Sequence, residues 1–226
     1  MSWSGGKDSA FALWKLMNDP RYEVVRLHTT FGEESRRVGM HGIHESLIEK
    51  QAESIGMALD KIYYPASGDN KEYETAINSY LDTLKTEGIE TIAYGDIYLE
   101  DLKAYRETQL SKRDFKAIFP LWKKDTTETT RNFIAAGFQT LICAADADLI
   151  EEKWVGSIFN LDFLKNLPNK IDPCGENGEF HTFCYDGPIF QHSVAVSKKQ
   201  TISKSYHFKT EEGKEIEKKF WFAELR

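Results

Sequence analysis

Six consecutive residues near the start of the chain have the side chains and the backbone freedom needed to bind phosphate. They are Ser4, Gly5, Gly6, Lys7, Asp8 and Ser9. Two adjacent glycines let a ligand approach the backbone because no Cβ is in the way. A helix that begins at about Asp8 would point its free N–H groups and the positive end of its dipole at that ligand. The serines and Lys7 would add hydrogen bonds and charge, and Asp8 is suited to hold Mg²⁺ on a polyphosphate.

This phosphate-binding loop is not of the Walker type, because its spacing differs from GxxxxGK[ST]. A glycine-rich turn that merely caps a helix is the alternative interpretation. Only three residues precede the loop. The strand expected before it is therefore either very short or begins further upstream, since strands usually run about five or six residues.

A second segment rich in functional groups lies at 172–183, with the sequence DPCGENGEFHTF. Within six residues it carries Glu176, Asn177, Glu179 and His181. Carboxylates and an imidazole can transfer protons, and an amide can orient a substrate through hydrogen bonds. The alternative is a solvated surface loop in which His181 is an ordinary packed histidine.

The first part of the chain, residues 1–145, alternates between β-rich runs and helical patterns. Strands are predicted at 22–28, 59–64, 91–94 and 139–143, with a further short strand at 118–119. Apolar residues recur at helical spacing within 11–17, 43–55, 73–84 and 125–134, and Asp125 and Glu128 resemble a capping box. This alternation predicts an α/β fold with a doubly wound parallel sheet, whose ligands bind beyond the carboxyl ends of the strands.

The pattern changes in the second part, residues 146–226. A short helix is predicted at 161–167, followed by a loop-rich stretch and then by strands at 193–197, 201–208 and 218–225. A hairpin turn at 211–213 would join the last two strands, so the simplest assembly is a small antiparallel β-meander. Its apolar residues Ile202, Tyr206 and Phe208 are expected to pack on the first part, the alternative being a homodimer through these strands.

Composition limits the classes of function. The chain has 36 acidic and 29 basic residues, a net charge of −7 and 41% hydrophobic residues, which is typical of a soluble globular protein. The acidic balance argues against a broad nucleic-acid surface. No apolar run approaches the roughly 18 residues of a membrane span, and the first residues do not form a secretory signal.

The three cysteines are too few for a disulfide framework, which predicts a reducing compartment and hence the cytoplasm. Cys174, His181 and Cys184 would supply at most three ligands to a metal, and no CxxC pair is present. No structural zinc site is therefore expected.

The loop SGGKDS at residues 4–9 resembles the PP-loop of the N-type ATP pyrophosphatases. That superfamily has a doubly wound, HUP-like sheet and cleaves ATP between the α and β phosphates. The resemblance implies that Ser4, Gly5, Gly6 and Ser9 cradle the pyrophosphate end of ATP. It also implies that Lys7 contacts phosphate and that Asp8 helps to bind Mg²⁺.

The segment CGENGEFHTF, followed by YDGPIF, resembles the signature of the diphthine–ammonia ligase family. Segments in the same order along the chain fit that family as well, namely GDI at 95–97, EDL at 100–102, YRE at 105–107, FPLW at 119–122 and DFL at 162–164. The implied reaction is an ATP-driven amidation. The carboxylate of diphthine, on translation elongation factor 2, attacks the α-phosphate of ATP, and ammonia then displaces AMP from the acyl-adenylate.

The resemblance assigns roles to the second segment. Glu176 and Glu179 would bind ammonium and remove its proton, Asn177 would orient the nitrogen or the acyl oxygen, and His181, with a pKa near neutrality, would shuttle a proton. Gly95 and Asp96, just past a predicted strand, would contact Mg²⁺ or substrate. His41 and His44 would lie near the nucleotide, although a surface loop is equally compatible with their chemistry.

Three functions remain open at this point. The first is the amidation of diphthine or of another carboxylate. The second is a PP-loop tRNA-modifying enzyme, although the chain lacks the paired cysteines of sulfur transfer and a basic face. The third is a regulatory protein that binds ATP or AMP without catalysing a reaction.

Overall fold

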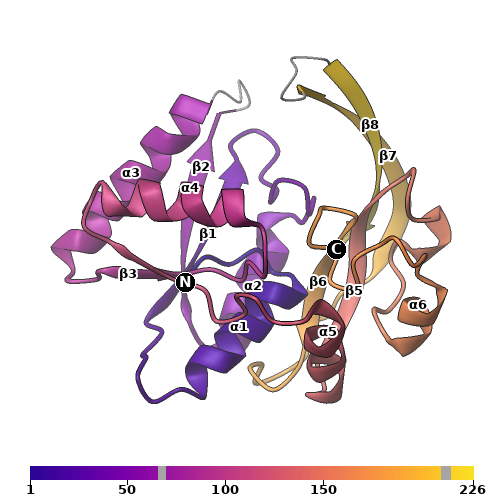
Figure 1. Ribbon diagram of the computed structural model, residues 1–226, viewed down its shortest axis with the longest axis horizontal. Helices are drawn as coiled ribbons and strands as arrows, with labels where there is room; N and C mark the ends of the chain where they lie inside the picture. The colour runs from indigo at the N-terminus through magenta and orange to yellow at the C-terminus, as the bar shows by residue number, and fades with distance from the viewer. Residues whose placement is uncertain (66–69, 210–214) are drawn as a thin grey trace.

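The computed structural model describes residues 1–65, 70–209 and 215–226 and has two parts that lie side by side (Figure 1). The first part contains α1 (Lys7–Met17), β1 (Arg26–Gly32), α2 (Glu45–Ile55), β2 (Ala58–Tyr64), α3 (Asn70–Thr86), β3 (Thr91–Ala93), α4 (Glu100–Ser111) and β4 (Lys116–Ile118). The second part begins at α5 in the structure, and not at residue 146 as the sequence pattern suggested. It contains α5 (Thr126–Ala135), β5 (Gln139–Asp146), the 3-10 helix η1 (Glu152–Trp154), α6 (Leu161–Asn166), β6 (Phe180–Asp186), β7 (Lys198–Lys209) and β8 (Glu215–Leu225).

The strands of the first part form two parallel pairs, β1 with β2 and β3 with β4. The first three residues of the chain link these pairs through backbone hydrogen bonds. Trp3 N–H donates to the carbonyl of His28 on β1 at 2.8 Å, and Ser2 N–H donates to the carbonyl of Ala93 on β3 at 2.9 Å. The phosphate-binding loop and α1 follow directly, so the loop lies where an extended segment meets a helix N-terminus. The mixed α/β class is confirmed.

The second part is built on a four-stranded antiparallel sheet with the order β6-β5-β8-β7. The long strands β7 and β8 pair from Lys198↔Leu225 to Lys209↔Glu215, and β8 continues onto β5 through Ala144↔Phe222. The turn predicted at 211–213 lies outside the described residues. Ile202 and Tyr206 pack against Phe220 and Phe222 of their own sheet, and Met40 is the residue of the first part in the same cluster. The side chain of Phe208 lies outside the described residues.

Several predictions about strands are wrong. The run at 139–143 was expected in the parallel sheet, but β5 is antiparallel to both β6 and β8. Residues 193–197 form no strand, and β6 at Phe180–Asp186 takes a place in the sheet instead. The order β6-β5-β8-β7 is not a meander, because β6 and β7 are consecutive in the chain without being neighbours. The strand predicted at 22–28 begins four residues later, at Arg26.

The helices follow the predicted apolar stripes more closely. Helix α5 begins as expected, with the Asp125 carboxylate accepting from the backbone N–H of Glu128 at 2.7 Å. Helix α4 was not predicted. Leu110 is the one fully buried residue of this helix, so its sequence has little of the apolar stripe that marks a helix.

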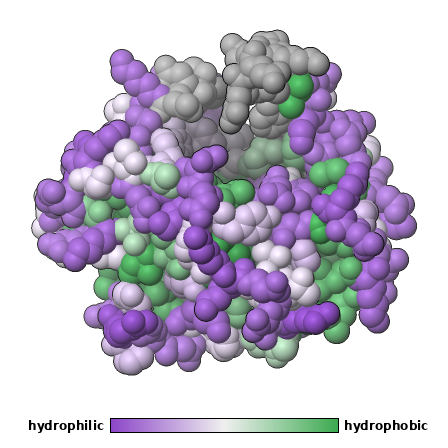
Figure 2. Space-filling model, in the orientation of Figure 1, coloured by the Kyte–Doolittle hydropathy of each residue, from purple (hydrophilic) through white to green (hydrophobic). Residues whose placement is uncertain are grey.

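The largest core cluster joins the two parts of the chain. It contains Trp3, Phe11 and Leu13 from the first part and Phe133, Phe159 and Phe180 from the second, together with many smaller side chains. The face shown in Figure 2 is mainly hydrophilic, with apolar side chains in small separate patches. No helix among the described residues is long and apolar enough to cross a membrane.

Candidate active site

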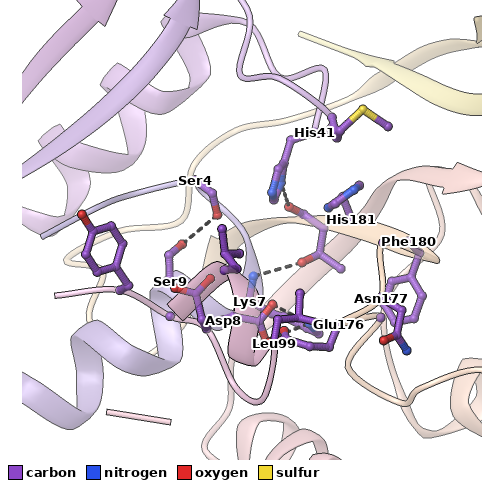
Figure 3. Close-up of a pocket in the computed structure, with 18 of the residues that line it drawn as sticks. Ser4, Lys7, Asp8, Ser9, His41, Leu99, Glu176, Asn177, Phe180 and His181 are labelled. Carbon is purple, nitrogen blue, oxygen red and sulfur yellow. Dashed lines mark hydrogen bonds and ion pairs between the residues drawn. The ribbon is translucent and has the colours of Figure 1, made fainter. Parts of the chain in front are cut away.

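One cavity of about 560 Å³ brings together the two segments singled out in the sequence. It is lined by most of the predicted site residues, which are Ser4, Lys7, Asp8, Ser9, Gly95, Asp96, Glu176, Asn177 and His181. In Figure 3, Lys7, Asp8 and Glu176 gather at one side of this cavity, and His41 and His181 lie together at another. Residues about 170 positions apart in the sequence therefore face the same space.

The glycines of the phosphate-binding loop shape it without lining the cavity. Gly5 has a φ of 78°, and a Cβ there would lie 2.6 Å from the side chains of Gln51 and Ile48. The Gly5 carbonyl accepts hydrogen bonds from Gln51 Nε2 at 2.9 Å and from the backbone N–H of Cys184 at 2.8 Å. A larger residue would therefore strain the backbone and displace the loop from its support. The sequence predicted that these glycines leave room for a ligand, but at Gly5 the space of a Cβ is taken by Gln51 and Ile48, and neither glycine lines the cavity.

The two serines and the first residues of α1 line the cavity, and some of their donors already bond to the protein. The hydroxyls of Ser4 and Ser9 lie 3.2 Å apart, and Ser9 Oγ donates to the Gly6 carbonyl at 2.9 Å. The backbone N–H of Lys7 donates to Thr182 Oγ1 at 3.0 Å, which ties the loop to β6. The first turn of α1 thus holds its dipole toward the cavity on a rigid support.

Lys7 and Asp8 form a tight ion pair, with Lys7 Nζ 2.7 Å from Asp8 Oδ2. Burial acts against the Lys7 charge, but the Asp8 carboxylate and other nearby acidic groups outweigh it, so the pKa of Lys7 is raised. Burial also raises the pKa of Asp8, with Lys7 opposing that effect. The Lys7 side chain is 5% exposed and that of Asp8 is 32% exposed. Asp8 is thus the member of the pair that a cation in the cavity can reach.

The loop after β3 packs directly onto the start of α1. A Cβ on Gly95 would lie 2.9 Å from the carbonyl carbon of Asp8 and 3.0 Å from the backbone nitrogen of Ser9. Asp96, next in sequence, forms an ion pair with Arg106 of α4 at 2.9 Å, and the Arg106 guanidinium lies 4.2 Å from the centre of the Tyr94 ring. The close approach through Gly95 brings the Asp96 carboxylate to the same cavity as Asp8.

Glu176 holds the loop after β3 in place, and its pKa is raised. Its Oε1 accepts from the backbone N–H groups of Ile97 at 2.7 Å and Tyr98 at 3.1 Å. Burial raises the pKa of Glu176 to about 7, even though the two N–H groups stabilise its charged form. No hydrogen bond to Oε2 is found among the described residues. One carboxylate oxygen is therefore anchored, and the group can gain or lose a proton near neutral pH.

Glu179 differs from Glu176 in its position and its contacts. It is 5% exposed and does not line the cavity. Its carboxylate accepts from the backbone N–H of Asp172 at 3.2 Å, and from the backbone N–H of Asn177 at 2.9 Å and the side-chain amide of Asn177 at 3.0 Å. This geometry fits a role in shaping the loop rather than the contact with ammonium predicted from the sequence.

The two histidines in the cavity are neutral. The rings of His41 and His181 lie 4.6 Å apart, and His41 Nδ1–H donates to the Thr182 carbonyl at 3.2 Å. Burial lowers the pKa of His41 to about 4 and lowers that of His181 well below its ordinary value. The expectation that the pKa of His181 lies near neutrality is therefore wrong. His44 does not line the cavity; its Nδ1 accepts from the backbone N–H of Ser46 and caps α2.

Other residues that line the cavity were not singled out as site residues in the sequence. Tyr94, Leu99, Leu102 and Thr182 line the cavity alongside the predicted residues, as do Arg106 of α4 and Lys218 and Phe220 of β8. Lys218 is held by an ion pair with Asp146 at 3.1 Å. Leu102, Arg106 and Thr182 lie within segments that carry the family resemblance, so the sequence held a signal for them. Lys218 lies in no such segment, and its place in the cavity depends on how β8 packs.

All three cysteines are buried and unpaired. Burial raises the pKa of Cys174 and of Cys184 to about 12, and that of Cys143 is also raised. These thiols are therefore protonated and poorly reactive at neutral pH. Among the described residues, no group of three or more His, Cys, Asp or Glu side chains is arranged to hold a metal ion.

The structure is that of an α/β protein in which a helix N-terminus and several ionisable side chains face one cavity. A family model described as the diphthamide synthase N-terminal domain matches residues 1–113, and one described as the diphthamide synthase C-terminal domain matches residues 125–221. The chain belongs to the diphthamide synthase family, as its motifs predicted.

Curated relatives extend this similarity over most of the chain. A diphthine–ammonia ligase of Homo sapiens is 27% identical, over 88% of this chain and 82% of that protein. One of Danio rerio is 23% identical, over 88% of this chain and 86% of that protein. One of Schizosaccharomyces pombe is 24% identical over 89% of this chain, but the match spans 36% of that longer protein.

Proposed function

We propose that this protein is an ATP-dependent ligase that converts a carboxylate into an amide through an acyl-adenylate, with ammonia as the nitrogen donor and AMP and pyrophosphate as products. The observation that carries the proposal is the single cavity shared by the loop at 4–9 and the segment at 175–182. A two-step reaction on one bound intermediate requires both groups of residues to reach the same molecule. At about 560 Å³, the cavity falls within the usual range for small-molecule sites.

The first part would bind ATP as a doubly wound sheet of the PP-loop type, with the phosphates at the N-terminus of α1. Ser4, Ser9 and Lys7 would hold the pyrophosphate end. Asp8 and Asp96 line the same cavity, and one or two carboxylates with phosphate oxygens form the usual protein site for Mg²⁺. When bound, Mg²⁺ would neutralise charge on the phosphates and make the α-phosphate easier to attack.

Glu176 is suited to the second half-reaction, in which ammonia displaces AMP. Ammonium predominates at neutral pH and is not a nucleophile, so a base must remove its proton. A carboxylate with a pKa of about 7 can do this at neutral pH more effectively than an ordinary, more acidic one. Asn177 lines the same cavity and would orient the acyl oxygen or the nitrogen.

The names of the relatives point to the acyl substrate. We infer that it is diphthine on translation elongation factor 2, because several relatives named diphthine–ammonia ligase match most of this chain. Free cysteines are consistent with action in the reducing cytoplasm. A tRNA-modifying enzyme that transfers sulfur is disfavoured, because all three thiols are buried and their pKa values are raised.

The test is to mix the protein with ATP, Mg²⁺ and elongation factor 2 that carries diphthine. We expect exchange of labelled pyrophosphate into ATP without ammonium, since the acyl-adenylate forms reversibly, and amide and AMP once ammonium is added. ATP binding without exchange would overturn the proposal in favour of a regulatory nucleotide-binding protein. Glu176→Gln is expected to keep the exchange and to slow amidation by ammonium about 10²- to 10⁴-fold.

Hydroxylamine distinguishes a Glu176 that acts as a base from a Glu176 that only holds the loop after β3 in place. Hydroxylamine is mostly unprotonated at neutral pH and needs no base before it attacks. The Glu176→Gln protein should therefore form hydroxamate at nearly the wild-type rate. Equal losses with ammonium and hydroxylamine would remove Glu176 as the base.

A further inference from the structure

A second, smaller chamber adjoins the catalytic cavity on the side of α3 and α4. Its volume is about 60 Å³, and it lies between those helices and the strands β1 and β3. Ser2, Tyr94 and Arg106 line both spaces, so the chamber and the cavity share a wall. Nothing in the reaction described so far uses the chamber.

The chamber contains a buried imidazole with an unused nitrogen. His28 is 6% exposed, and its Nδ1 has no hydrogen-bond partner among the described residues. Burial, the positive charge of the N-terminal amine and Arg106 lower the pKa of His28 well below its ordinary value. A neutral imidazole presents one nitrogen as an acceptor, and leaving such a group buried without a partner is costly. A ligand that donates a hydrogen bond would satisfy it.

The charge in the chamber favours a cation. Glu74 of α3 lines it and accepts from Tyr105 Oη at 3.2 Å and from Gln109 Nε2 at 3.1 Å, but no basic side chain among the described residues pairs with it. Arg106, the basic residue of the wall, forms an ion pair with Asp96, which offsets only part of the positive charge that acts on His28. A carboxylate without a counter-ion thus remains beside the chamber.

Aromatic rings supply further acceptors. The lining includes Tyr73, Tyr80, Tyr94 and Tyr105. Aromatic rings attract small cations, although the Arg106 guanidinium already lies 4.2 Å from the centre of the Tyr94 ring. The ring of His28 lies 5.0 Å from that of Tyr80. Burial raises the pKa of Tyr94 to about 12, so this side chain is uncharged at neutral pH.

Size restricts the occupant to a few heavy atoms. A single water needs about 10–15 Å³ on the same measure, so 60 Å³ accommodates a few atoms but not a nucleotide or an acyl chain. Resting on the function proposed above, we propose that this chamber is a binding site for ammonium, the nitrogen donor, held by Glu74, His28 and the surrounding tyrosine rings next to the catalytic cavity. Ammonium has four N–H donors, which can bond to the Glu74 carboxylate and to Nδ1 of His28. From the chamber it would reach Glu176 by passing the residues that line both spaces, Ser2, Tyr94 and Arg106.

A direct test uses thallium(I), which is close to ammonium in size and scatters anomalously. Crystals of the full chain soaked in a thallium salt should show an anomalous peak between Glu74 and His28, and Glu74→Gln should remove it. This readout needs no turnover. A wild-type protein without a peak in the chamber overturns the site, whatever its activity.

A kinetic test connects the chamber to the reaction. Glu74→Gln removes the charge but keeps an oxygen for Tyr105 and Gln109, and it should raise the KM for ammonium about tenfold, in keeping with the loss of one hydrogen bond to a charged group. The affinity for ATP and the pyrophosphate exchange should stay unchanged. The matched control is Asp82→Asn, on the same helix, where the carboxylate is 64% exposed and pairs with Arg113.

A second variant fills the space without changing charge. Ile77 lines the chamber and is partly buried, so Ile77→Phe should also raise the KM for ammonium, whereas Ile77→Val should not. A KM for ammonium in Glu74→Gln that equals that of Asp82→Asn overturns the link to the reaction. If the wild-type protein makes no amide at all, the proposed function fails, and the thallium experiment still decides whether the chamber binds a cation.

Discussion

Replacing Glu176 by glutamine should stabilise the folded protein at alkaline pH and leave it unchanged at acidic pH. The reason is that the fold raises the pKa of this carboxyl from 4.5 to about 7, mainly through burial. Glutamine keeps an oxygen that can accept from the N–H groups of Ile97 and Tyr98. The substitution therefore removes the cost of the buried charge while preserving the contact that holds the loop.

The size and sign of the effect follow from this raised pKa. Below pH 4.5 the carboxyl is protonated in both the folded and the unfolded chain, so its burial costs nothing. Between pH 4.5 and 7 the unfolded chain releases the proton while the folded chain retains it, and the wild-type protein loses stability as the pH rises. The full difference is at most about 3 kcal/mol. Because Glu176 is only partly buried, solvent screening reduces it to about 1–2 kcal/mol.

The measurement is urea unfolding of both proteins at pH 5 and pH 8. We expect a small difference between the free energies of unfolding at pH 5, where the carboxyl is already partly ionised in the unfolded chain, and a larger difference at pH 8, with Glu176→Gln the more stable protein. Glu179→Gln is the contrasting control, because the buried Glu179 carboxylate accepts three hydrogen bonds, and its replacement should destabilise by about 1–3 kcal/mol at both pH values. A constant difference between Glu176→Gln and wild type from pH 5 to 8 would refute the raised pKa.

Two further predictions concern the packing of the site. Gly95→Ala should lower the affinity for ATP about tenfold and destabilise the fold by about 1–3 kcal/mol, because the new Cβ would press on the backbone of Asp8. Gly39→Ala is the control, because a Cβ there would lie 3.9 Å from its nearest neighbour. ATP titration measures the affinity, and thermal unfolding measures the stability. The three cysteines should resist iodoacetamide at pH 8 in the folded protein and react in urea, because they are buried and their pKa values are raised. Rapid labelling of Cys174 in the folded state, seen by mass spectrometry, would contradict this.

The sequence located the chemistry well where it depends on a few adjacent residues. The loop at 4–9 could be singled out locally, because glycines and small polar residues at a helix start are suited to bind an anion. The acid-rich segment at 172–183 was likewise visible from its composition. Whether these two segments face one cavity was not visible, because about 170 residues separate them and contact depends on the pairing of β5 with β6 and β8.

The two glutamates of that segment show why local sequence is insufficient. Glu176 and Glu179 were predicted to share one role, and they differ in burial, partners and access to the cavity. His181 was expected to titrate near neutrality, but burial, with smaller effects of His41 and Lys7, lowers its pKa well below the ordinary value. A side chain's pKa depends on solvent access and neighbouring charges, and the chain sets both only when it is folded.

The order of residues alone fixed the family, the phosphate-binding loop and most of the helices of this protein, since these follow from short motifs and from apolar periodicity. Tertiary structure decided which strands pair, which carboxylate reaches the cavity and how Arg106 and Glu74 form the wall of a chamber beside it. The physical reason is that strand pairing, burial and electrostatic fields arise between residues distant in the chain, and no local pattern encodes them.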